Sequence, residues 1–156
     1  MRKNVLSVGL ALLMFGEARL VMAEDLSGIR AAADSREGSV THEGRREPVV
    51  ALTASAYDLP GVDKQEVIGL LDRFLAYGCS IQEPDRQGMS PINVAILIAE
   101  ADLLLYLLKA GGDPEQKITG SRPWANGRNS IEFAQALYKV DASNKRKKFI
   151  DILSSH

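Results

Sequence analysis

One stretch of this chain occurs twice, and that repetition restricts the fold more than any other feature of the sequence. The segment 70–80 (LLDRFLAYGCS) returns 33 residues later as the segment 103–113 (LLLYLLKAGGD). Each copy has apolar residues at helical spacing and ends in glycine, which takes the left-handed cap of a helix and lets the chain turn sharply away. A period of this length predicts a fold made of repeated helical units.

Apolar residues gather at helical spacing in six blocks, which predict six helices in three pairs. The blocks are Val49 to Tyr57, Val67 to Tyr77, Ile92 to Ala99, Leu103 to Ala110, Ile131 to Tyr138 and Phe149 to Leu153. No stretch alternates with the period of a strand over a useful length, so a core built on a sheet is not expected. We therefore predict an all-α fold.

Capping residues mark where the first helix of each pair begins. Ser90 is a favourable N-cap and Pro91 is suited to the first helical position. Asn129 or Ser130 fills the capping role in the last unit, and Pro48 opens the first.

The middle unit, Asp85 to Lys117, resembles an ankyrin repeat over its full length. Its Gly-x-Ser-Pro-Ile-Asn-x-Ala start is similar to the family's Gly-x-Thr-Pro-Leu-His-x-Ala, and its Leu-Leu-Lys-Ala-Gly-Gly-Asp end to Leu-Leu-x-x-Gly-Ala-Asp. The outer units resemble the family in part, with stretched connections expected at Asp58–Lys64 and Val140–Lys147, as terminal capping repeats would have. The resemblance implies an ankyrin-repeat solenoid of about three helix-turn-helix units over residues 46–156.

Residues 1–23 have the pattern of a secretory leader. Arg2 and Lys3 precede an apolar run, Val5–Phe15, and Val21-Met22-Ala23 supplies small residues for cleavage. The alternative, a permanent anchor, would need a run about twice as long. We expect a periplasmic or secreted protein with no stable membrane insertion after cleavage, in which residues 24–45 form a flexible lead-in.

Without the leader, 16 basic and 19 acidic side chains remain, a net charge of −3 that does not favour nucleic acid as a partner. The run Lys145–Lys148 is interpreted as solvated, with contact to phosphate or an acidic protein as the alternative. Cys79 is the only cysteine, so no internal disulfide can form. It follows Gly78 where the ankyrin family usually has alanine, which favours a packing role over that of a reactive thiol.

Side chains for catalysis are scarce. His42 and His156 are the only histidines, one in the lead-in and the other the last residue. No metal, cofactor or catalytic site is predicted, and we expect a protein that is not an enzyme. A hydrolase using Asp63, Glu66 or Glu100 is the least favoured alternative.

The resemblance implies recognition of another protein, through loop tips and the exposed face of each first helix. The predicted contact residues are Glu83, Asp85, Arg86, Gln87, Met89, Leu97, Ile98, Arg122, Trp124 and Arg128. Tryptophan and arginine are frequent binding hot spots, although Trp124 could instead fold back over the last unit's core.

We therefore predict an exported module with one principal protein partner. The preferred hypothesis is a bacterial immunity protein that binds and neutralises a secreted toxin or effector. The alternatives are an accessory protein supporting an exported enzyme, and a structural component of a larger envelope assembly.

Overall fold

The computed structural model describes residues 26–42 and 44–156, and this part of the chain is mostly helical. The expected leader, residues 1–23, lies outside the described residues. A helix over residues 26–35 comes first, followed by a two-stranded antiparallel hairpin. The strands and later helices are β1 (Ser39–His42), β2 (Arg45–Pro48), α2 (Val49–Ser55), α3 (Lys64–Ala76), α4 (Pro91–Leu97), α5 (Ala101–Lys109), α6 (Ser130–Val140) and α7 (Asn144–Ser154).

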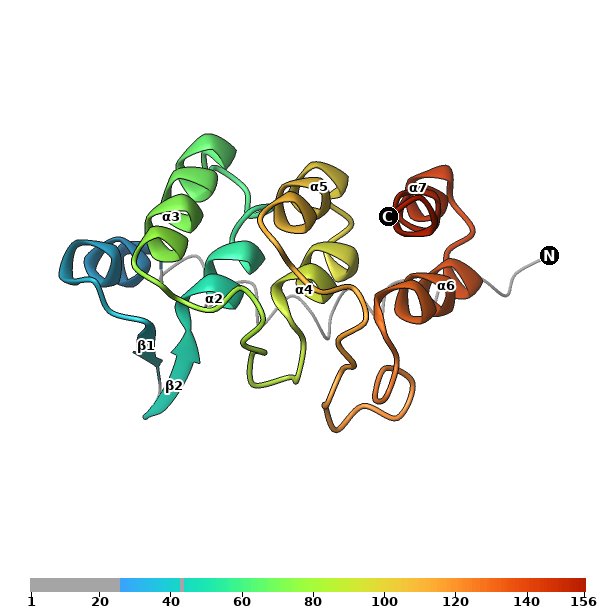
Figure 1. Cartoon of the computed structure of the whole chain (residues 1–156), viewed down its shortest axis with the longest axis horizontal. Helices are drawn as coiled ribbons and strands as arrows, with labels where there is room; N and C mark the ends of the chain where they lie inside the picture. The colour runs from blue at the N-terminus through green and yellow to red at the C-terminus, as the bar shows by residue number, and fades with distance from the viewer. Residues whose placement is uncertain (1–25, 43) are drawn as a thin grey trace.

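Helices α2 to α7 form three pairs that stack one beside the next. Within the pairs α2 packs on α3, α4 on α5 and α6 on α7, and α4 also contacts both α2 and α6. Figure 1 shows two rows, with α3, α5 and α7 in one and α2, α4 and α6 in the other. The hairpin and the connections 77–90 and 110–129 project from the same side of the stack. The prediction that the chain folds mainly into helices is confirmed.

One continuous apolar core runs through all three pairs. The six residues 91–96 of α4 are all buried, because this helix has neighbours on both sides. In α5 the residues Leu103, Leu104, Leu107 and Leu108 form the buried stripe, at the spacing of one helix face. The core therefore follows the repeat that the sequence shows.

The predicted helix ends are confirmed. Gly78 and Gly111 adopt φ angles of +87° and +99°, the left-handed conformation that ends a helix. The Ser90 side chain accepts a hydrogen bond from the Asn93 N–H, with Pro91 at the first helical position. Asn129 caps α6 in a reciprocal capping box with Glu132.

The expected flexible lead-in over residues 24–45 does not match the structure from residue 26 onward. In the helix 26–35, Leu26, Ile29, Ala32 and Ala33 are buried in the main core. Their spacing is that of one helix face, but only Leu26 and Ile29 are strongly apolar, since alanine adds little apolar signal. The packed structure therefore includes residues that the sequence pattern assigned to a linker.

The hairpin was also not predicted. Ser39 pairs with Pro48 and His42 with Arg45, and Gly44 adopts a φ of +73° at the turn. Its strands are mostly polar, and so lack the alternation of apolar residues that reveals a strand packed on a core.

The last connection is shorter than expected. We predicted a stretched segment over Val140–Lys147, but α7 already begins at Asn144 because Ser143 accepts a hydrogen bond from the Arg146 N–H. The run Lys145–Lys148 therefore lies in the first turns of a helix. The stretched connection at Asp58–Lys64 is present, since α2 ends at Ser55 and α3 begins at Lys64.

Candidate functional site

The segments that project from the helical stack form a continuous feature, which we call the loop edge. It consists of the hairpin 39–48 and the connections 77–90 and 110–129 (Figure 1). Most of the predicted contact residues lie in these segments.

Gln82 ties the two long connections together. Its Nε2 donates to the Gly111 carbonyl (3.0 Å), and its Oε1 accepts from the Asp113 N–H (3.1 Å). Gln116 Nε2 donates in turn to the Gln82 carbonyl (2.8 Å). One glutamine thus uses its backbone and both side-chain groups to fix one connection against the next.

A close backbone contact at Gly88 joins the same two connections a second time, nearer the loop tips. The Thr119 N–H donates to the Gly88 carbonyl (3.1 Å), and a Cβ on Gly88 would lie 2.5 Å from the Gly120 nitrogen. Gly88 also has a φ of +75°. Both the backbone angle and the space therefore require glycine at this position.

The connection 77–90 is fixed to the hairpin as well. Arg86 Nε lies 3.4 Å from Oε1 of Glu47, a buried residue of β2. Asp85 shapes the same turn, because its Oδ1 accepts from the N–H groups of Gln87 (2.8 Å) and Met89 (3.0 Å). Burial raises the pKa of the Asp85 carboxyl.

The predicted contact residues of the first loop are not equally available. Glu83 and Arg86 are exposed, whereas Gln87 is half-buried. Oδ1 of Asp85 already accepts two hydrogen bonds within its own turn. Met89 is 1% exposed and belongs to the core. The prediction that Met89 contacts a partner is therefore wrong, because an apolar side chain next to a helix cap packs under the helix.

Leu97 and Ile98 are also poorly placed. Both are half-buried against the core at the C-terminal end of α4, whereas the loop edge lies at its N-terminal end. They do not join the other predicted contact residues.

The connection 110–129 brings Arg122, Trp124 and Arg128 together around one turn. The N–H groups of Ala125 and Asn126 donate to the Arg122 carbonyl, and Arg128 Nε donates to the Trp124 carbonyl (2.7 Å). The Trp124 ring stacks on Phe133 with 5.7 Å between centroids, yet the residue is 41% exposed. One side of the Trp124 ring therefore covers the core of the last unit, and contact of the exposed remainder with a partner stays a prediction.

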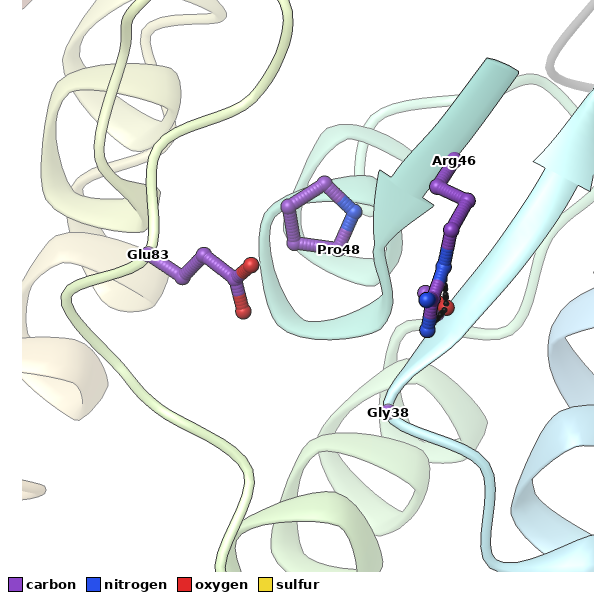
Figure 2. A pocket seen from close by; sticks show the side chains of 5 residues that line it. Gly38, Arg46, Pro48 and Glu83 are labelled. Atoms are coloured by element: carbon purple, nitrogen blue, oxygen red, sulfur yellow. Dashed lines mark hydrogen bonds between the residues drawn. The ribbon is translucent and has the colours of Figure 1, made fainter.

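A hollow of about 440 Å³, which we call the notch, lies between the hairpin and the connection 77–90. It is lined by Gly38, Ser39, Arg46, Pro48 and Glu83 (Figure 2). Arg46 donates from Nε (2.9 Å) and Nη2 (2.7 Å) to Ser39 Oγ. Of these residues only Glu83 was predicted, and Gly44 within a polar stretch was the one signal for a hairpin here.

Cys79, Asn93 and Arg146 each make contacts that stabilise the fold. Burial, with a smaller contribution from the Glu83 charge, raises the pKa of the Cys79 thiol, which favours its unreactive protonated form. Asn93 Oδ1 accepts from Ser130 Oγ (2.9 Å) and so links α4 to α6. Arg146 donates to the carbonyls of Ile96 and Leu97 (2.5 and 3.1 Å), so the basic run is only partly solvated.

The carboxylates of the hydrolase alternative are each engaged elsewhere. Asp63 caps α3, Glu66 pairs with Arg30, and Glu100 pairs with Lys64. Within residues 26–42 and 44–156, no group of three His, Cys, Asp or Glu side chains is arranged to hold a metal ion.

Compared with known proteins, the chain matches no family model, no curated protein and no solved structure. Among the helices of the described residues, none combines the length and the apolar character needed to cross a membrane.

Proposed function

We propose that this chain is an ankyrin-type repeat module whose loop edge binds one protein partner. The observation that supports the proposal is that hydrogen bonds and an ion pair join each projecting segment to the next. Gln82 joins the two long connections, Thr119 and Gly88 join them again, and Arg86 joins the hairpin. Loops held in this way lose little conformational entropy on binding, so more of the contact energy appears as affinity.

The repeat architecture supports the same proposal. Three helix pairs stack through α2, α4 and α6, with glycine caps at Gly78 and Gly111 and a Ser-Pro start at α4. In solenoids of this kind the helices form the core and the projecting segments form the binding surface.

The most favoured biological role is that of an exported immunity protein that blocks a secreted toxin. This role requires a rigid, dedicated binder and no chemistry of its own. The exposed part of Trp124, with Arg122 and Arg128 beside it, offers the residue types that most often dominate such binding.

A capture experiment tests the binding proposal. The full chain with a C-terminal tag is expressed in its own organism and isolated with whatever it binds, beside a Trp124→Ala/Arg122→Ala variant. A Lys145→Ala/Lys148→Ala variant is the matched control, since these exposed side chains lie on α7 away from the loop edge. We expect one stoichiometric partner, lost only by the Trp124/Arg122 variant, with helicity by circular dichroism unchanged in both.

The immunity role has its own test. The captured partner is directed to the periplasm of a test strain, with and without the chain. Survival that depends on the chain supports an immunity protein, whereas a harmless partner with enzymatic activity supports the accessory role. Capture that the Trp124/Arg122 variant does not reduce would refute the proposed surface.

A further inference from the structure

The notch holds two opposite charges that do not meet. Arg46 and Glu83 both line it, yet among the described residues Glu83 forms no hydrogen bond or ion pair. In Figure 2 the Glu83 side chain extends from the connection 77–90 toward Pro48, and Arg46 lies on the far side of Pro48. A cation and an anion that face one space without neutralising each other can both bind an outside group.

The Arg46 guanidinium is held in place before any ligand arrives, and the backbone next to Glu83 is fixed as well. Two hydrogen bonds to Ser39 Oγ fix the Arg46 guanidinium, while its Nη1 makes none within the described chain. Glu83 directly follows Gln82, which is anchored to Gly111 and Asp113. A bound guanidinium keeps donors for a carboxylate, and the cost of ordering it has already been met.

The hairpin face sets the character of the occupant. Ser39, Arg46 and Pro48 share one face of the hairpin, because Ser39 pairs with Pro48 and alternate residues of a strand point the same way. The only apolar side chain in the lining is the Pro48 ring. The notch is half open to solvent, and its volume of about 440 Å³ has room for a short stretch of polar peptide lying across it.

We propose that the notch binds an extended peptide segment of the partner that carries an acidic and a basic side chain close together. The acidic group binds Arg46 and the basic group binds Glu83. This inference rests on the proposed function, since it names the chemistry of the partner segment that the loop edge receives.

The test uses defined probe peptides rather than the unidentified partner. The ¹⁵N-labelled full chain is titrated with Ac-Ala-Glu-Ala-Lys-Ala-NH₂, and in parallel with the Glu/Glu and Lys/Lys versions of the same peptide. We expect saturable shifts at the amides of Gly38, Ser39, Arg46 and Glu83 with the Glu/Lys peptide, and affinity about tenfold weaker with either single-sign peptide.

Variants make the result specific. Arg46→Gln and Glu83→Gln should each weaken the Glu/Lys peptide about tenfold, and Ser39→Ala should weaken it less by freeing the guanidinium. Lys148→Gln on α7 is the control and should have no effect. Absence of saturable shifts at the notch, or equal affinity for all three peptides, would overturn the proposal.

The outcome is separable from that of the proposed function. If partner capture depends on Trp124 and Arg122 but is unchanged by Arg46→Gln and Glu83→Gln, the loop edge stands as the binding surface and the notch proposal fails. If the peptides bind at the notch but no protein partner is captured, the binding function fails while the notch remains a site for charged peptides.

Discussion

At the scale of single residues, Ala99 is one of two non-glycine residues of the described chain with a left-handed backbone, the other being Arg36. Ala99 adopts a φ of +60° just after α4, where Gly78 and Gly111 take the same conformation after α3 and α5. The β-carbon of an alanine in this region crowds the following carbonyl. We predict that Ala99→Gly raises the free energy of unfolding by about 0.5–1 kcal/mol, measured by urea denaturation.

Gly111→Ala is the matched control for Ala99. A Cβ at Gly111 would meet nothing within 4 Å, so only the backbone conformation opposes it. This change should lower stability by about 1 kcal/mol. If Ala99→Gly also lowers stability, packing of the Ala99 methyl outweighs the backbone strain.

The buried carboxyl of Asp85 should make the stability of the fold depend on pH. Its pKa is raised in the folded state, chiefly by burial, so the protonated form is the one that folding favours. The contribution of this group to stability is therefore complete below its unfolded pKa and is lost as pH rises through its folded pKa. Asp85→Asn keeps the Oδ1 acceptor for Gln87 and Met89 but cannot ionise.

We expect the stability of Asp85→Asn relative to the natural chain to increase between pH 3 and pH 7. Thermal unfolding over this range measures the difference. A difference that is constant with pH would show that the backbone hydrogen bonds to the carboxylate balance its burial, and a dependence of opposite sign would show that they outweigh it.

Residue-scale features were predictable from sequence where the chemistry is local. Gly78, Gly111 and Ser90 were assigned correctly, and Asn129 was one of two candidates for its cap, because capping depends on neighbours within one turn. Ala99 could not be found in this way. Alanine is an ordinary helix residue, so its presence in the sequence does not mark a position with a left-handed backbone.

At the scale of elements, Arg146 connects the last helix to the middle pair. Its guanidinium donates to the carbonyls of Ile96 and Leu97 in the last turn of α4, and its side chain is only 17% exposed. We predict that Arg146→Ala lowers the free energy of unfolding by about 1.5–3 kcal/mol. Thermal or urea unfolding followed by circular dichroism gives the measurement.

Lys145 and Lys148 test whether Arg146 stabilises the fold through its position or only through its charge. Lys145→Ala and Lys148→Ala remove the same charge from exposed sites and should change stability by no more than about 0.5 kcal/mol. Equal losses for all three variants would mean that the basic run acts through its net charge. Sequence alone could not separate Arg146 from its neighbours, because its acceptors lie 49 and 50 residues away.

The loop edge depends on a close contact between two connections. Gly88→Ala would place a methyl group 2.5 Å from the Gly120 nitrogen and 2.5 Å from the Thr119 carbonyl carbon. We predict that this change releases the connection 110–129, so that trypsin cleaves it after Lys117 at least about tenfold faster.

Gly127→Ala controls for the backbone angle in that experiment. Its φ of +79° is similar to that of Gly88, but nothing lies within 4 Å of the added Cβ. Cleavage should rise much less in this variant. Similar rates for both variants would show that backbone conformation, not the contact between connections, determines the order of this segment.

At the scale of the whole molecule, the sequence period predicted the stacked pairs but not where the stack begins. The repeat is visible because α3 and α5 meet similar neighbours and so keep similar apolar patterns. Within the described part of the chain the helix 26–35 lies at one end of the stack (Figure 1), where a short stripe of small and apolar residues suffices to dock it. The hairpin and the notch were missed for a related reason, since polar segments positioned by tertiary contacts leave no periodic pattern.

Ion pairs and buried apolar side chains both hold the helix 26–35 to the stack. Two ion pairs link it to α3, Arg30 with Glu66 and Asp34 with Arg73, and all four side chains are at least one-third exposed. Exposed pairs contribute about 0–1 kcal/mol, whereas removing most of a buried Ile side chain costs about 2–5 kcal/mol. Ile29 is 1% exposed.

We therefore expect Ile29→Ala to destabilise the chain by about 2–4 kcal/mol and Arg30→Ala by less than about 1 kcal/mol. In a stack, each unit is stabilised by contacts with the units next to it. Hydrogen exchange in Ile29→Ala should therefore increase first in residues 26–35 and in α3, before α6 and α7. An Arg30→Ala loss as large as that of Ile29→Ala would assign the docking of this helix to charge. Uniform acceleration of exchange along the chain would instead show that the stack unfolds as one unit, with the first helix an integral part of its core.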